Sequence, residues 1–133
     1  MKKDRNQRIE IINQIIKEIA SRGRDFLNSK EHNRTSYFVW DGRTLWFIDY
    51  YTGIPLAMRK GSSYPTKKQE YSFSGGGTLW SLVNDFKDFI FGNDNSNGKN
   101  GYGGLYCTHW GYPEEDMEAI RKIAKELGYL KGE

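Results

Sequence analysis

The stretch YFVWDGRTLWFIDYY, residues 37–51, decides the fold because two runs of alternating side chains flank one Asp-Gly pair. Asp-Gly is a favoured pair for a two-residue type I′ turn, in which both central residues need a positive φ. Seven of these residues are aromatic, and aromatic side chains are enriched in strands. The stretch is therefore predicted to be a β-hairpin in which Trp40 faces Arg43 and Arg34 faces Asp49.

Alternation gives this hairpin two faces, and both are apolar. One carries Tyr37, Val39, Thr44, Trp46, Ile48 and Tyr50, and the other carries Arg34, Ser36, Phe38, Trp40, Arg43, Leu45, Phe47 and Asp49. A sheet covered by helices on one side only leaves its other face partly in water. Several aromatic side chains on such a face indicate an interaction site.

Helical periodicity and turn residues predict the remaining elements. The expected helices cover residues 5–22, residues 78–91 and a segment from Pro113 to the residue before Gly128. A third strand is expected over residues 54–58, with Pro55 indicating a sheet edge, and a fourth over residues 105–110. The order α-β-β-β-α-β-α predicts an α+β fold with a mainly antiparallel sheet of about four strands and helices packed mostly on one face.

Length and composition predict one globular domain over residues 1–133, with a flexible loop over the Gly- and Asn-rich residues 92–104. The single cysteine cannot form an internal disulfide, which fits a reducing compartment. The sequence contains no apolar run long enough to span a membrane, and no apolar segment typical of a signal peptide follows the basic amino terminus. We therefore expect a cytoplasmic protein without a membrane partner.

Charge is unevenly distributed along the chain. Residues 1–68 carry 14 basic and 7 acidic side chains, whereas residues 69–133 carry 6 and 10. A basic half of this kind indicates a face that meets a phosphate backbone or an acidic protein, although a solvated surface with chance clustering gives the same count.

The candidate partner-binding surface combines aromatic and basic side chains. The predicted binding residues are Phe38, Trp40, Arg43 and Phe47 as anchors, with Arg34, Arg59 and Lys60 at the rim. Aromatic rings beside cations can stack bases and follow a nucleic-acid backbone. The same side chains dominate hot spots in protein interfaces. A third possibility is that helices cover this face too, in which case the rings belong to the core.

Catalytic and metal-binding motifs are weak in this sequence. Cys107 and His109 alternate onto one face of a predicted strand, so they could form a nucleophile with its base or half of a metal site. Two such residues do not complete a metal site, and a buried cysteine beside a structural histidine is the commoner arrangement. A small hydrolase or metal enzyme that uses Cys107 and His109 therefore stays an alternative, and no cofactor or metal is predicted.

Three segments carry a resemblance to other proteins: Ser21-Arg22-Gly23-Arg24, Trp46 to Gly53, and Gly75-Gly76-Gly77-Thr78-Leu79. They resemble a set of small uncharacterised proteins from bacteriophages and other bacterial mobile elements, and the likeness runs from about residue 20 to the last helix. Small phage and plasmid proteins without catalytic motifs often act by binding, and they include inhibitors of bacterial defence complexes such as anti-CRISPR proteins. The resemblance implies a phage or mobile-element context. Together with the charge asymmetry and the two apolar faces of the hairpin, it leads us to expect a non-enzymatic protein that binds a bacterial protein or nucleoprotein complex, with direct nucleic-acid binding as the alternative.

Overall fold

The computed structural model describes residues 4–22, 26–61, 73–92, 104–107 and 110–130. Its elements, in chain order, are α1 (Arg5–Ala20), β1 (Asn28–Ser29), β2 (Arg34–Thr35), β3 (Tyr37–Trp40), β4 (Leu45–Ile48), β5 (Pro55–Met58), α3 (Gly77–Ile90) and α4 (Glu114–Glu126). Strands β3, β4 and β5 form an antiparallel sheet in that order, and β1 and β2 form a separate two-stranded sheet. The predicted α+β class is confirmed.

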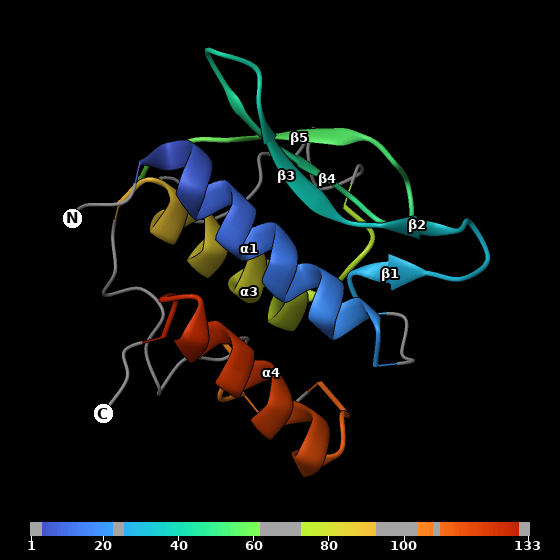
Figure 1. Ribbon diagram of the computed structural model, residues 1–133. Helices are drawn as coiled ribbons and strands as arrows, with labels where there is room; N and C mark the ends of the chain where they lie inside the picture. Colours follow the sequence, from blue (N-terminus) through green and yellow to red (C-terminus); the bar gives the residue numbers. More distant parts are fainter. Residues whose placement is uncertain (1–3, 23–25, 62–72, 93–103, 108–109, 131–133) are drawn as a thin grey trace.

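The helices lie on one side of the three-stranded sheet (Figure 1). Helix α1 runs beneath β3 with α3 beside it, and α4 lies on the far side of α1 from the sheet. The core fills the space between these layers as one continuous cluster of apolar side chains. The prediction that the helices pack mostly on one face of the sheet is therefore confirmed.

Helix α1 illustrates how the sequence sets these layers. Asp4 and Gln7 form a capping box, in which each side chain accepts a hydrogen bond from the other residue's backbone N–H, at 2.8 and 2.9 Å. The buried isoleucines of α1 recur at helical spacing, so their side chains form one broad apolar stripe facing the sheet, α3 and α4: Ile9, Ile12, Ile15, Ile16 and Ile19.

The register of the β3–β4 hairpin differs from the predicted one by two residues. Trp40 pairs with Leu45 and Phe38 pairs with Phe47, so the loop has four residues rather than two. The Asp41 carboxylate accepts hydrogen bonds from the Thr44 backbone N–H at 2.6 Å and from that of Arg43 at 2.8 Å, and this bonding stabilises the longer loop. A shift of two residues preserves the side-chain alternation, so the two predicted faces keep their members.

One further strand prediction was wrong. The described part of residues 105–110 forms turns rather than a fourth strand, with the Cys107 N–H donating to the Gly104 carbonyl at 3.0 Å. Leu105, Cys107 and Trp110 are nevertheless buried, because this apolar run packs as a loop against the helices. The short β1–β2 hairpin was not predicted. The predicted third strand is confirmed as β5, an edge strand that begins at Pro55.

Two remaining expectations concern membranes and the loop. No helix in the described parts of the chain has the length and apolarity needed to cross a membrane. The loop predicted over residues 92–104 lies outside the described residues except at its two ends.

Asn13 of α1 occupies the outer edge of β3. Its side-chain amide donates to the Phe38 carbonyl at 2.9 Å and accepts from the Phe38 N–H at 2.8 Å, as a neighbouring strand would. Replacing Asn13 with alanine is expected to lower the free energy of unfolding by about 1–2 kcal/mol, because it leaves two backbone groups without these partners. Urea unfolding tests this, with the exposed Gln14→Ala on the same helix as control. Equal stability of the two variants would show that Asn13 does not support the strand.

Candidate functional site

The predicted anchors Phe38 and Phe47 are core residues. Their side chains are 1% and 0% exposed, and their rings pack against each other with centroids 5.1 Å apart. The expectation that this face of the hairpin is open to solvent is therefore wrong. The physical reason is that α1 lies against β3 on this side and buries the face beneath the helical layer.

The opposite face of the sheet is the exposed one. Tyr37 is 45% exposed and Val39 40% exposed, whereas Trp46, Ile48 and Ala57 are half-buried. These five residues define the outer face. No helix or strand within the described ranges covers it, as Figure 1 shows. The molecule thus carries an apolar sheet face in contact with water, made from Ala57 and four residues of the hairpin face on which no binding residue was predicted.

A groove lies at the end of the sheet where β3 turns into β4, and it brings together four of the seven predicted binding residues. We call it the basic groove. It has a volume of about 390 Å³ and is lined by Trp40, Arg43, Thr44, Leu45, Trp46, Ala57, Met58, Arg59, Lys60 and Phe91. Antiparallel pairing of Leu45 with Met58 explains the gathering, because it sets the loop before β4 beside the residues that follow β5. Trp46 and Ala57 belong to both surfaces, so the basic groove is continuous with the outer face.

The cations of the basic groove are open to solvent. Arg43, Arg59 and Lys60 are exposed, and none of them has an ion-pair partner among the described residues. Trp40 is half-buried and packs against the core, with the Arg5 guanidinium stacked 4.1 Å from its ring centroid. The groove therefore offers positive charge around an aromatic wall that is held by the core.

Asp41 holds the rim of the basic groove in place. One of its carboxylate oxygens accepts from the Trp46 indole N–H at 2.8 Å, and the other accepts the loop N–H groups described above. The hydrogen bond from Trp46, followed by those from Thr44 and Arg43, lowers the pKa of the Asp41 carboxyl below its usual range. The carboxylate thus stays ionised and fixes the orientation of the Trp46 ring, a role that sequence reasoning missed.

Arg34 does not belong to the basic groove. It lies at the opposite end of the sheet, where its guanidinium donates to the Tyr51 carbonyl at 2.9 Å. The predicted pair with Asp49 is replaced by this contact, as the shift in register requires. The Asp49 carboxylate instead accepts hydrogen bonds from the backbone N–H of Thr52, in the turn after β4, and from the Ser74 hydroxyl. Both distances are 2.9 Å.

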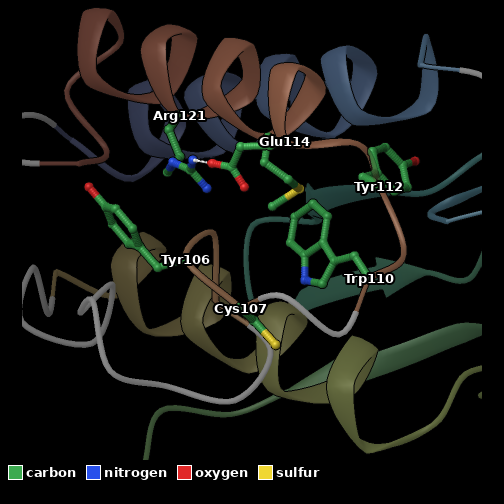
Figure 2. A pocket seen from close by; sticks show the side chains of 7 residues that line it. Tyr106, Cys107, Trp110, Tyr112, Glu114 and Arg121 are labelled. Atoms are coloured by element: carbon green, nitrogen blue, oxygen red, sulfur yellow. Dashed lines mark hydrogen bonds and ion pairs between the residues drawn. The ribbon is translucent and has the colours of Figure 1, made fainter.

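A second pocket lies between α4 and the chain that precedes it (Figure 2). It has a volume of about 240 Å³ and is lined by Tyr106, Cys107, Trp110, Tyr112, Glu114, Met117 and Arg121. The Arg121 guanidinium donates to the Glu114 carboxylate at 2.6 Å and to the Leu105 carbonyl at 3.1 Å. We call this the aromatic pocket.

The Cys–His hypothesis falls partly outside the described residues. Cys107 is buried and lines the aromatic pocket, whereas His109 is not among the described residues. Within the described ranges, no group of three or more His, Cys, Asp or Glu side chains is placed to hold a metal ion. The paired role of Cys107 and His109 stays a prediction.

Asp85 in α3 has the largest described pKa shift of a carboxyl group. Burial, reinforced by repulsion from Asp88, raises its pKa from 3.8 to about 7, against the opposing effect of Lys87. Asp85 lines neither the basic groove nor the aromatic pocket. We therefore interpret this shift as a property of the core rather than as a sign of catalysis.

A pH dependence of stability follows from that shift. Between pH 3.8 and about 7 the folded chain retains a proton on Asp85 that the unfolded chain releases, so stability falls as the pH rises through this window. Asp85→Asn should remove this dependence and stabilise the protein at pH 8 by about 1–2 kcal/mol, less than the full shift implies because the side chain is partly exposed. Urea unfolding of both proteins at pH 4, 6 and 8 measures it. An unchanged difference between them across this range would contradict the prediction.

Comparison with known proteins gives the family. The family model described as YoqU matches residues 2–133. A protein of Bacillus subtilis strain 168, named as an SPbeta prophage-derived uncharacterised protein YoqU, is 36% identical over 128 residues, which cover 94% of this chain and 84% of the relative. No solved structure matches the chain significantly. Because the family model matches nearly the whole length of the chain, the chain belongs to the YoqU family.

Proposed function

We propose that this chain is a non-enzymatic binding protein of a bacteriophage or mobile element, and that its basic groove and outer face bind a bacterial protein or nucleoprotein complex. The prophage origin stated in the name of the B. subtilis relative supports the context. The observation that carries the proposal is the convergence of Arg43, Arg59 and Lys60 around Trp40, at the rim of an exposed apolar sheet face.

The two surfaces have complementary physical roles in this proposal. Cations that form no ion pair with a described residue attract an acidic surface and accelerate encounter. Aromatic side chains that are held in place, such as Trp40 by the core and Trp46 by Asp41, provide contact area at little further loss of conformational entropy. The outer face adds apolar area next to the groove.

Inhibition is the outcome that we propose for this binding. A small protein that occupies an acidic or nucleic-acid-binding surface of a bacterial defence complex blocks access to that surface without any chemistry of its own. Anti-CRISPR proteins, to which the resemblance in the sequence pointed, include inhibitors of such complexes. The proposal therefore concerns a defence nuclease or its nucleoprotein assembly as the target class.

Direct binding of nucleic acid is the second candidate function. The three groove cations are placed to meet phosphates, and the exposed Tyr37 with the half-buried Trp46 could stack bases on the outer face. Affinity would then fall steeply with salt, with a slope of log K against log salt of about −2 to −3 for three neutralised phosphates.

Affinity capture separates the two functions. The tagged chain is incubated with bacterial lysate, with and without nuclease treatment, and the captured material is identified by mass spectrometry and by nucleic-acid staining. A protein that is retained after nuclease treatment, and lost when the groove cations are reversed in charge, is the expected result. Capture of nucleic acid alone would replace the leading proposal with the second one. Capture that is indifferent to the groove cations would contradict both.

A further inference from the structure

The aromatic pocket is separate from the basic groove and contains a polar group that no described residue satisfies. The Trp110 side chain is 7% exposed, yet its indole N–H has no hydrogen-bond acceptor among the described residues. Its ring is stacked on Phe26 with centroids 4.6 Å apart and meets Tyr112 edge-on at 5.7 Å, so it cannot turn away. A buried N–H is costly without an acceptor, and such groups in folded proteins usually have one. The pocket thus requires an acceptor beside Trp110.

Arg121 supplies further donors on the opposite side. Its two described hydrogen bonds, to Glu114 and Leu105, hold the guanidinium in place, and the guanidinium also lies 5.2 Å from the Tyr106 ring centroid. Figure 2 shows the Trp110 indole across the pocket from Tyr106, with Arg121 and Glu114 along the α4 side. A guanidinium carries five N–H groups, so it can donate to a ligand while it keeps both of these bonds.

The remaining lining determines what kind of molecule fits. Aromatic rings and the Met117 side chain bound the pocket, which favours a flat, weakly polar ligand. Glu114 balances the charge of Arg121 and can also accept a hydrogen bond, so the pocket offers donors and an acceptor and does not favour a simple anion. Its volume of about 240 Å³ is below the range of roughly 300–1,000 Å³ typical of drug-sized ligands, which suits one or two fused rings.

We propose that the aromatic pocket binds a small planar heterocycle of the nucleobase type, whose acceptors take the Trp110 and Arg121 N–H groups and whose amino group donates to Glu114. This inference does not depend on the proposed function, because it involves none of the residues of the basic groove or the outer face. The heterocycle can come from a free base or from a base of a nucleic acid.

The Trp110 indole N–H resonance in a ¹H–¹⁵N spectrum tests the proposal directly. It is assigned by its disappearance in Trp110→Phe, and the full chain is titrated with cytosine and with adenine. One of the two bases is expected to move this resonance with a Kd of about 1 mM or tighter, the range within reach of a ligand of eight to ten heavy atoms. Arg121→Gln should weaken that binding at least tenfold, whereas Arg34→Gln, the same change outside both the aromatic pocket and the basic groove, should leave it unchanged.

Two outcomes would overturn the proposal. One is a Trp110 resonance that neither base moves, as expected if a bound water is the acceptor. The other is an affinity of Arg121→Gln for the base equal to that of the unchanged chain. If Trp110→Phe does not fold, Arg121→Gln still tests the proposal, because removal of the guanidinium leaves the apolar lining of the pocket intact. A four-nucleotide single strand of the same base separates the two sources. Tighter binding than the free base, with the same loss in Arg121→Gln, indicates a nucleic acid, and equal or weaker binding indicates a free base.

Discussion

Replacing Phe47 with alanine is expected to lower the free energy of unfolding by about 3–5 kcal/mol, the usual cost of removing a buried phenylalanine ring. Phe47 is fully buried in β4, and its ring centroid lies 5.1 Å from that of Phe38 and 6.4 Å from that of Phe73. The substitution opens a cavity between the sheet and the helices. Urea unfolding followed by circular dichroism measures the loss.

The control for Phe47→Ala is Tyr37→Ala on the outer face. Tyr37 is an aromatic residue of the adjacent strand, but 45% of it is exposed, so the change in stability should stay within about 0.5–1 kcal/mol. The comparison tests which face of the hairpin is covered. A stable Phe47→Ala beside a destabilised Tyr37→Ala would reverse the assignment of the two faces.

The second large effect concerns binding. Combining Arg43→Glu with Arg59→Glu is expected to weaken the affinity for the captured partner at least ~100-fold, because each reversal replaces an attraction with a repulsion worth about 1.4 kcal/mol or more. Both residues are exposed and make no ion pair among the described residues, so the fold should stay intact. Surface plasmon resonance at two salt concentrations measures the affinity, and circular dichroism checks the fold.

A matched control separates local charge from net charge. Lys17→Glu combined with Lys122→Glu changes the net charge of the chain by the same amount, but the two lysines lie on α1 and on α4, away from the basic groove. Affinity should fall by less than about threefold in this variant at physiological salt, because charges beyond one Debye length are screened. An equal loss in both variants would indicate long-range attraction alone and no specific surface.

The helices were predictable from the sequence because their signals are local. In α1 the capping pair Asp4 and Gln7 and the isoleucine spacing act within a few residues of each other, and the observed helix Arg5–Ala20 ends two residues before the predicted limit. Helices α3 and α4 have no side-chain cap, but their apolar periodicity is equally local and predicted both of them. The edge position of β5 was also readable, because Pro55 cannot donate to a neighbouring strand.

The covered face of the sheet could not be decided from the sequence. Both faces of the hairpin alternate apolar side chains, so Phe38 on one side and Val39 on the other carry similar signals. The choice was made by α1, which lies on the side of Phe38 and uses Asn13 to hold the edge of β3. The alternation of side chains within the hairpin does not reveal this long-range contact.

Only part of the candidate site could be predicted from the sequence. Trp40, Arg43, Arg59 and Lys60 lie together in the structure, because a hairpin followed by an adjacent strand places them at one end of the sheet, and their role in binding stays a prediction. Arg34 does not belong to the groove because it lies six residues before Trp40, at the opposite end of the sheet. The register affected only its predicted pairing with Asp49, since the Asp41 side chain caps a longer loop. The aromatic pocket was not predicted, because the pattern of residues 105–110 indicates a strand, whereas Leu105, Cys107 and Trp110 are buried outside any strand.

The central claim is that the basic groove is a binding surface, and a photo-crosslinking amino acid tests it most directly. Benzoylphenylalanine is introduced at the position of Arg59 in one variant and at that of Lys122 in another, and each is irradiated with the captured partner. The account predicts a covalent adduct from position 59 and none from position 122. An adduct from position 122, with none from position 59, would contradict it.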